Sequence, residues 1–170
     1  MLVIHGTKKF LDRVGRPSVE PELKSTTALG SWFATVLFWK PQVALFVNAR
    51  TLLPIFVPFA PATSVIDRFR TELEAVLSAH EVDRAFVDHE LAEMGAHVLA
   101  RTNSRSVLGS MNDFTFLAEV DQEHGRSADL RSLSMRLANT PCGPLRSGTG
   151  FPDLELRAVV DEFAEHDLQP

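Results

Sequence analysis

The sequence predicts a single α+β domain, residues 1–170, in which about five helices cover an antiparallel sheet of about four to five strands. Three observations support this. A short β-prone run and a helical run open the chain, three β-branched and aromatic runs follow, and helical periodicity dominates the rest. A chain of this length removes about 70% of its unfolded surface on folding, which is enough for one layer-on-layer core.

The N-terminal part is predicted to hold a strand over residues 2–5 and a helix over residues 8–14. Gly6 and Thr7 form the turn between them, and Gly15 ends the helix. Residues 15–30 show little apolar periodicity and are predicted to form a loop. Loops of that length in compact domains are often functional.

Three strands are predicted over residues 32–39, 43–48 and 52–57, joined by short polar turns into an antiparallel meander. The middle run is apolar on both faces, so we expect helices on one side and a further strand or a second subunit on the other. Pro54 and Pro58 cannot donate hydrogen bonds to a neighbouring strand, so the third strand is expected at an edge of the sheet.

The second half of the chain is predicted to be mostly helical. Helices are expected over residues 64–79 and 84–94, then from Ser104 to near residue 121, and a helix capped by Ser127 follows. An extended piece at residues 98–100 is expected to join the sheet. Residues 151–170 are predicted to form an acidic amphipathic helix that starts near Pro152 and buries Leu156, Val159, Val160 and Phe163.

Composition excludes several classes of protein. The net charge of −5 disfavours broad coating of nucleic acid, although residues 1–60 hold seven Lys and Arg against three acidic residues. No apolar run approaches the ~18 residues that span a bilayer, and no secretory signal is found, so no membrane partner is expected. The single cysteine, Cys142, excludes an intrachain disulfide and favours a reducing, cytoplasmic location.

The candidate binding site is the start of the helix that follows residue 103. Ser104 is predicted to cap this helix, and the positive helix end beside Arg101 and Arg105 suits a phosphate or carboxylate. If the turn carrying Arg50 lies at the same end of the sheet, three guanidinium groups converge there. The alternative is that these residues occupy separate surface positions and pair with acids. The predicted ligand-binding residues are Arg101, Ser104, Arg105 and Ser106, with Lys8, Lys9 and Arg50 in support.

Three functions are compatible with such a site. The first is a binding module for a phosphate-bearing small molecule, another anion or a short nucleic acid. The second is an enzyme acting on a phosphorylated or nucleotide substrate, with His5 or Asp113 as general base. The third is a structural protein that forms a homo-oligomer through an exposed, aromatic-rich sheet.

Neither a metal nor a cofactor is expected. His89, Glu93 and His97 are spaced four apart, as ligands on one helical face would be, but Gly95 interrupts the helix before the third of them. Cys142 lies in a proline- and glycine-rich turn with no base nearby in sequence, so we expect a small buried side chain rather than a nucleophile.

Four strings resemble an uncharacterised family of small bacterial proteins, a domain of unknown function. They are Thr7-Lys8-Lys9, Leu45-Phe46-Val47-Asn48-Ala49-Arg50-Thr51-Leu52-Leu53-Pro54, Arg105-Ser106-Val107-Leu108-Gly109-Ser110-Met111-Asn112-Asp113 and Thr140-Pro141-Cys142-Gly143-Pro144. The resemblance covers about residues 1–145 and implies a bacterial cytoplasmic source. The sequence departs from it at Gly6, where the family pattern has a cysteine, so a thiol function at that position is absent.

Overall fold

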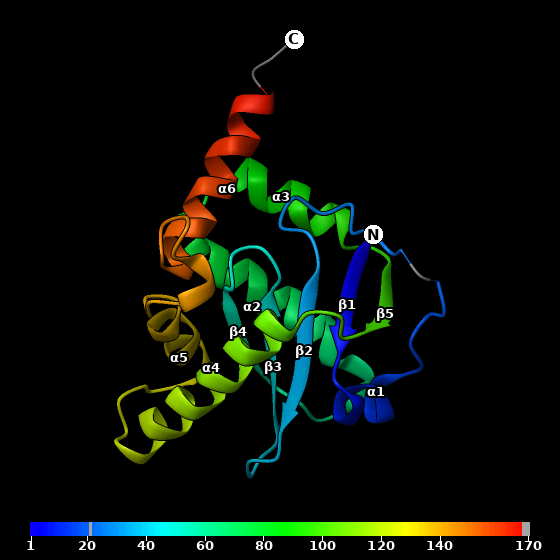
Figure 1. Ribbon diagram of the computed structural model, residues 1–170, viewed down its shortest axis with the longest axis vertical. Helices are drawn as coiled ribbons and strands as arrows, with labels where there is room; N and C mark the ends of the chain where they lie inside the picture. The colour runs from blue at the N-terminus through cyan, green and yellow to red at the C-terminus, as the bar shows by residue number, and fades with distance from the viewer. Residues whose placement is uncertain (21, 168–170) are drawn as a thin grey trace.

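A five-stranded sheet lies between two layers of helices in the computed structural model (Figure 1), which describes residues 1–20 and 22–167. The strands are β1 (Leu2–Gly6), β2 (Trp32–Leu37), β3 (Val43–Asn48), β4 (Pro54–Pro58) and β5 (His97–Arg101). Their order across the sheet is β4-β3-β2-β1-β5. The α+β class and the edge position of the third predicted strand, β4, are confirmed.

The sheet is mixed, which corrects the expectation of an antiparallel sheet. β2, β3 and β4 form the predicted antiparallel meander, but β1 runs parallel to both β2 and β5. The long segment after the first helix carries the chain back to the starting end of β1, and such a crossover makes the next strand parallel. Local turn residues identify hairpins, whereas the course of a 17-residue connection depends on tertiary contacts.

The sheet separates two apolar cores, where the sequence had suggested one. Side chains alternate along each strand, so Trp32, Ala34 and Val36 enter the first core while Phe33 and Leu37 enter the second. Every residue of β2 and β3 is buried. Helices cover both faces of β3, and no extra strand or second subunit is needed there.

Four helices cover the first face. They are α1 (Lys8–Val14), α2 (Val65–Ala79), α3 (Arg84–Glu93) and α6 (Pro152–Asp167), and a 3₁₀ turn (Ala62–Ser64) precedes α2. Phe69 of α2 packs between Trp32 and Phe46, with ring centroids 4.9 and 4.1 Å away. The last three residues of the predicted C-terminal helix, 168–170, lie outside the described part of the chain.

Two helices cover the second face, α4 (Arg105–Glu123) and α5 (Leu130–Leu137), followed by a 3₁₀ turn (Gly143–Leu145). Ser104 caps α4 as predicted, because its hydroxyl accepts a hydrogen bond from the Val107 amide at 3.2 Å. The predicted cap of α5 at Ser127 is wrong. The Asp129 carboxylate takes that position and accepts from the Ser132 amide at 2.8 Å.

The edges of the sheet are partly covered. At β4, the Phe56 amide donates to the Ser134 hydroxyl of α5 at 2.9 Å. At β5, the Leu99 carbonyl accepts from the Ser18 amide at 2.8 Å, which fixes the long segment after α1 beside this strand. None of the described helices has the length and apolar character needed to cross a bilayer.

Candidate functional site

A crevice opens where the parallel strands β1 and β5 end. Gly6 and Arg101, the last residues of the two strands, are paired in register. The chain leaves β1 for α1 on one face of the sheet and leaves β5 for α4 on the other, as Figure 1 shows. Neighbouring parallel strands whose connections diverge in this way leave space at their carboxyl ends, where α/β proteins bind ligands.

Two cavities meet at this point. The larger, of about 720 Å³, is lined by His5, Ala100, Arg101, Asn103 and residues 17–20 and 22–24. The smaller, of about 370 Å³, lies on the α1 side and includes Gly6, Lys8 and Thr102 in its wall. Arg101 and Pro17 border both cavities. Arg101 therefore lies where the two cavities meet.

His5 lies in the wall of the larger cavity, only 7% exposed. Its ring stacks on Phe33 of β2, with centroids 4.8 Å apart, and its Nδ1 lies 2.8 Å from the backbone carbonyl oxygen of Arg101. A carbonyl oxygen only accepts hydrogen bonds, so Nδ1 carries the proton. In the neutral ring Nε2 is then an acceptor, able to take a hydrogen bond or a proton.

Arg101 is exposed, and no carboxylate within the described residues lies at ion-pair distance from it. Ser104 uses its hydroxyl to cap α4. Arg105 and Ser106 follow on the first turn of α4, both exposed, beyond the residues that line the two cavities. The structure thus brings Arg101 to the lining of the crevice, but not Arg105 or Ser106.

The two lysines of α1 make other contacts. Lys8 borders the smaller cavity, but its Nζ lies 2.7 Å from the Asp12 carboxylate. Lys9 extends over the exposed ring of Phe38, with Nζ 5.3 Å from the ring centroid, and Arg13 lies over the same ring at 4.8 Å. Lys8 is near the crevice, whereas Lys9 points to the end of β2.

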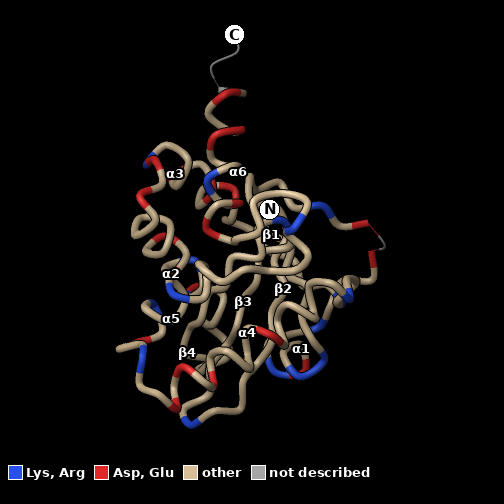
Figure 2. Tube along the Cα trace, turned by 60° about the vertical axis from the view of Figure 1, so that its left-hand side comes forward, with Lys and Arg blue, Asp and Glu red and all other residues tan. Residues whose placement is uncertain are grey.

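Arg50 lies at the opposite end of the sheet. It follows β3, whose last residue Asn48 is in register with Trp32 at the start of β2, and it forms an ion pair with Glu162 of α6. The condition for three converging guanidinium groups is therefore not met, and Arg50 occupies a separate surface position, paired with an acid, as the alternative had it. Figure 2 shows how charge is distributed over the molecule: Lys and Arg gather around α1, and acidic residues lie along α6.

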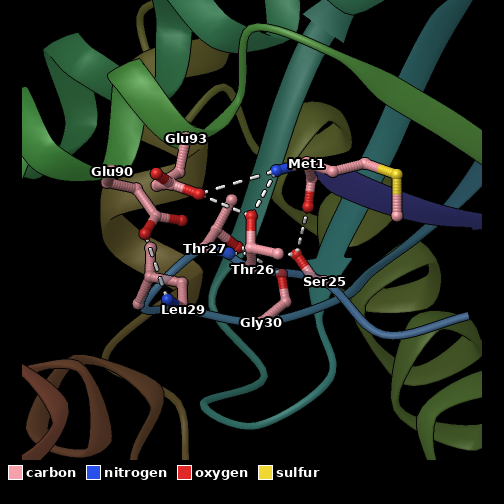
Figure 3. Close-up of polar contacts among 8 residues, drawn as sticks. All are labelled: Met1, Ser25, Thr26, Thr27, Leu29, Gly30, Glu90 and Glu93. Atoms are coloured by element: carbon pink, nitrogen blue, oxygen red, sulfur yellow. Dashed lines mark hydrogen bonds and ion pairs between the residues drawn. The ribbon is translucent and has the colours of Figure 1, made fainter.

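A second polar cluster, which the sequence did not single out, lies near the start of β1 (Figure 3). Glu90 of α3 is fully buried and accepts a hydrogen bond from the Leu29 amide at 3.1 Å. Burial raises the pKa of this carboxyl group to about 7, although hydrogen bonds from residues 27–29 oppose the shift. Thr26 donates to Glu93 one turn further along α3. These contacts hold the segment 26–29 against α3.

His89, Glu93 and His97, which have the spacing of metal ligands in the sequence, each contact a different residue. The His89 ring lies 4.8 Å from the Phe163 ring, Glu93 accepts from Thr26, and His97 of β5 lies 3.4 Å from Arg70. Among residues 1–20 and 22–167, no group of three or more His, Cys, Asp or Glu side chains is arranged to hold a metal ion.

Cys142 and Asp113 lie away from the crevice. Burial, with a smaller contribution from the charge of Asp113, raises the pKa of the Cys142 thiol to about 11. The thiol is therefore protonated at neutral pH and is a poor nucleophile. Asp113 lies close enough to Cys142 for its charge to affect the thiol, and it does not line the crevice. Of the two candidate general bases, only His5 lies there.

A family model described as a domain of unknown function (DUF6933) matches residues 3–155. The chain belongs to this family. The matched region runs from β1 into the first turn of α6 and includes the described residues of the crevice. Comparisons with curated proteins and with solved structures found no match.

The family assignment confirms the resemblance seen in the sequence. At Gly6, where that resemblance suggested a cysteine, the backbone is closely packed. A Cβ atom added there would lie 2.8 Å from the Leu11 side chain. A larger residue at this position therefore requires Leu11 to move.

Proposed function

We propose that this protein binds a small ligand with a phosphate or carboxylate group in the crevice between the ends of β1 and β5. The observation that carries the proposal is the position of Arg101. This exposed residue lines both cavities, at the point where the connections of two parallel strands diverge. Within the described part of the chain it has no ion-pair partner, so its charge is free to meet an anion.

The chemistry of the crevice supports an anion of modest size. A guanidinium group can donate two parallel hydrogen bonds to a phosphate or carboxylate. The cavity of about 720 Å³ lies in the range of small-molecule sites, roughly 300–1,000 Å³. The first turn of α4 adds the positive end of its helix dipole, which strengthens an anion site that Arg101 already defines.

The charged residues around the larger cavity limit where the anion can sit. Lys24 adds a second positive charge to the lining, whereas Glu20 and Glu22 are exposed acidic residues of the same segment. The anion is therefore held beside Arg101. This balance favours a nucleotide-sized ligand over a long nucleic acid, which needs a broad positive surface.

The first prediction tests this site directly. Arg101→Ala should weaken the binding of inorganic phosphate, glycerol phosphate or a nucleotide by about 10- to 100-fold, the loss expected for a charge-assisted hydrogen bond. Titration calorimetry measures the affinity, and thermal shift measures the stabilisation that a ligand gives to the folded state. The melting temperature without ligand should change little, because the side chain is exposed.

Arg146→Ala is the matched control, since this exposed arginine lies near the 3₁₀ turn of residues 143–145 and not at the crevice. Equal affinities for the wild type and Arg101→Ala would refute the site. A large loss of stability in Arg101→Ala without ligand would instead assign the arginine a structural role.

A further inference from the structure

Resting on the proposed anion site, we propose that Lys8 supplies its second cation, and that the preferred ligand carries a dianionic group such as the phosphate of a monoester. Arg101 binds this group, and the group draws Lys8 away from its partner Asp12. All three residues line the smaller of the two cavities, on the α1 side of the crevice.

The side chain of Arg101 leaves β5 on the face of the sheet that α1 covers. Arg101 lies two residues after Leu99, which is buried in the first core, and side chains alternate along a strand. It is also in register with Gly6 of β1, so the two residues share a face. A Cβ atom on Gly6 would meet the side chains of Leu11 and Phe10 of α1. The guanidinium group therefore extends from the face that carries the smaller cavity.

Lys8 lies close to Arg101 in the wall of this cavity. The chain reaches Lys8 two residues after Gly6, and Gly6 is the neighbour of Arg101 on the adjacent strand. Strands lie about 4.8 Å apart and each residue advances the chain by at most about 3.6 Å, so the Cα atoms of Lys8 and Arg101 are at most roughly 12 Å apart. Both residues are exposed, and the cavity between them measures about 370 Å³. Two such long side chains can reach one anion placed there.

The ion pair of Lys8 is one that a ligand can replace. Its Nζ lies 2.7 Å from Oδ2 of Asp12, one turn later in α1, and the two side chains are 89% and 54% exposed. An exposed pair of this kind contributes little, because water screens the charges and two flexible side chains must be held in place.

The charges around the smaller cavity favour a dianion. Lys8 and Arg101 are cations and Asp12 is an anion, so together they carry a net charge of +1. A monoanion is neutralised by Arg101 alone and leaves the pair of Lys8 and Asp12 intact. A dianion keeps one negative charge after it has bound Arg101, and this charge competes with the Asp12 carboxylate for Lys8.

Two phosphate esters of different charge test this exchange. At about pH 7.5 methyl phosphate is a dianion, because the second pKa of such a group is near 6, whereas dimethyl phosphate is a monoanion. Titration calorimetry should show that the wild type binds methyl phosphate about tenfold more tightly. Lys8→Gln should weaken methyl phosphate binding about fivefold, the loss of one ordinary hydrogen bond, and change dimethyl phosphate binding by less than about twofold.

Lys9→Gln is the matched control, since it removes the same charge from the next residue. The Lys9 Nζ lies over the Phe38 ring, and Lys9 is not part of the cavity lining. Its substitution should leave both affinities within about twofold of the wild type, because solvent screens a charge at the surface.

Asp12→Asn tests the exchange in the opposite direction. This substitution frees Lys8 and removes a negative charge from the cavity wall, so methyl phosphate should bind about two- to fivefold more tightly than to the wild type. A pair of residues that only stabilised α1 would not produce such a gain in affinity.

The outcomes separate the two proposals. Equal affinities of the wild type for the two esters, or a methyl phosphate affinity that Lys8→Gln leaves unchanged or that Lys9→Gln lowers equally, overturn the role of Lys8 and leave the Arg101 site standing. Unchanged or weaker binding to Asp12→Asn overturns the exchange as well. If neither ester binds, the proposed phosphate site fails, and the role of Lys8 fails with it.

Discussion

Glu90 is a carboxyl group placed where its charge is unfavourable. It is completely buried, yet it receives the Leu29 amide and helps to hold the segment 26–29 against α3. One carboxylate oxygen, Oε1, has no hydrogen-bond partner among the described residues. Desolvation therefore dominates over the hydrogen bonds, and the pKa of the group rises from 4.5 to about 7.

This pKa shift predicts a loss of stability as the pH rises. Between about pH 4.5 and 7 the unfolded chain has released the Glu90 proton while the folded chain keeps it. Each pH unit in this window then lowers the free energy of unfolding by up to about 1.4 kcal/mol, and the effect levels off above pH 7. Glu90→Gln should abolish this part of the slope and be more stable than the wild type at pH 8.

Urea unfolding at pH 5, 6, 7 and 8 measures the slope for the wild type and Glu90→Gln. Glu93→Gln is the matched control, one turn away on the same helix. Its carboxyl group is partly exposed, and its pKa is lowered, chiefly by the Thr26 hydroxyl. Its charge makes only a minor contribution to the raised pKa of Glu90, so this variant should keep most of the Glu90 slope. An unchanged slope in Glu90→Gln would show that the buried carboxyl group ionises without cost to the fold.

At the scale of elements, α4 and α5 are joined by an ion pair in which one side chain is buried and the other is half exposed. Asp121 of α4 is 4% exposed, and its carboxylate lies 3.2 Å from Nε of Arg136, whose side chain is half exposed. Its carboxylate oxygens make no hydrogen bond to any described residue. Arg136 is therefore the charge that compensates the burial of Asp121.

Arg136→Ala should lower the free energy of unfolding by about 1–2 kcal/mol, because it leaves a buried charge without a partner while water reaches part of the site. Denaturant unfolding measures the change. Arg84→Ala is the control, since Arg84 pairs with Glu74 and Asp88 on the exposed surface of α2 and α3. Equal effects of the two substitutions would show that the burial of Asp121 does not matter.

At the scale of the whole molecule, α6 belongs to the first core although most of it lies beyond the region matched by the family. Leu156 is fully buried, Phe163 packs edge-on against Phe86 of α3, and Arg50 pairs with Glu162. Side chains of this kind couple a terminal helix to the rest of the fold. We expect one cooperative unfolding transition for the protein.

Leu156→Ala should lower the stability by about 2–5 kcal/mol, the range for a buried leucine that leaves a cavity. Leu154→Ala, two residues earlier in α6 and 42% exposed in the wild type, should change it by less than about 0.5 kcal/mol. Far-ultraviolet circular dichroism reports the helices, and tryptophan fluorescence reports Trp32 in the first core together with Trp39 beside the second. A separate early transition in the helical signal would mean that α6 unfolds independently.

The sequence by itself determined the local elements of this protein. The spacing of apolar side chains and the residues typical of helix and strand ends located the meander, α2, and the cap of α4 at Ser104. These patterns are informative because the interactions behind them span only a few residues. They misplaced the cap of α5, where Ser127 and Asp129 are both chemically suitable and backbone geometry decides.

Only the tertiary structure decided the site. The parallel pairing of β1 with β2 and β5 brings His5 beside a residue 96 positions away, and the same pairing sends Arg50 to the far end of the sheet. Charge and residue type were visible in the sequence, but the partners of each charge were not. Strand order and register set those partners, and both follow from the burial of two apolar faces by the whole chain.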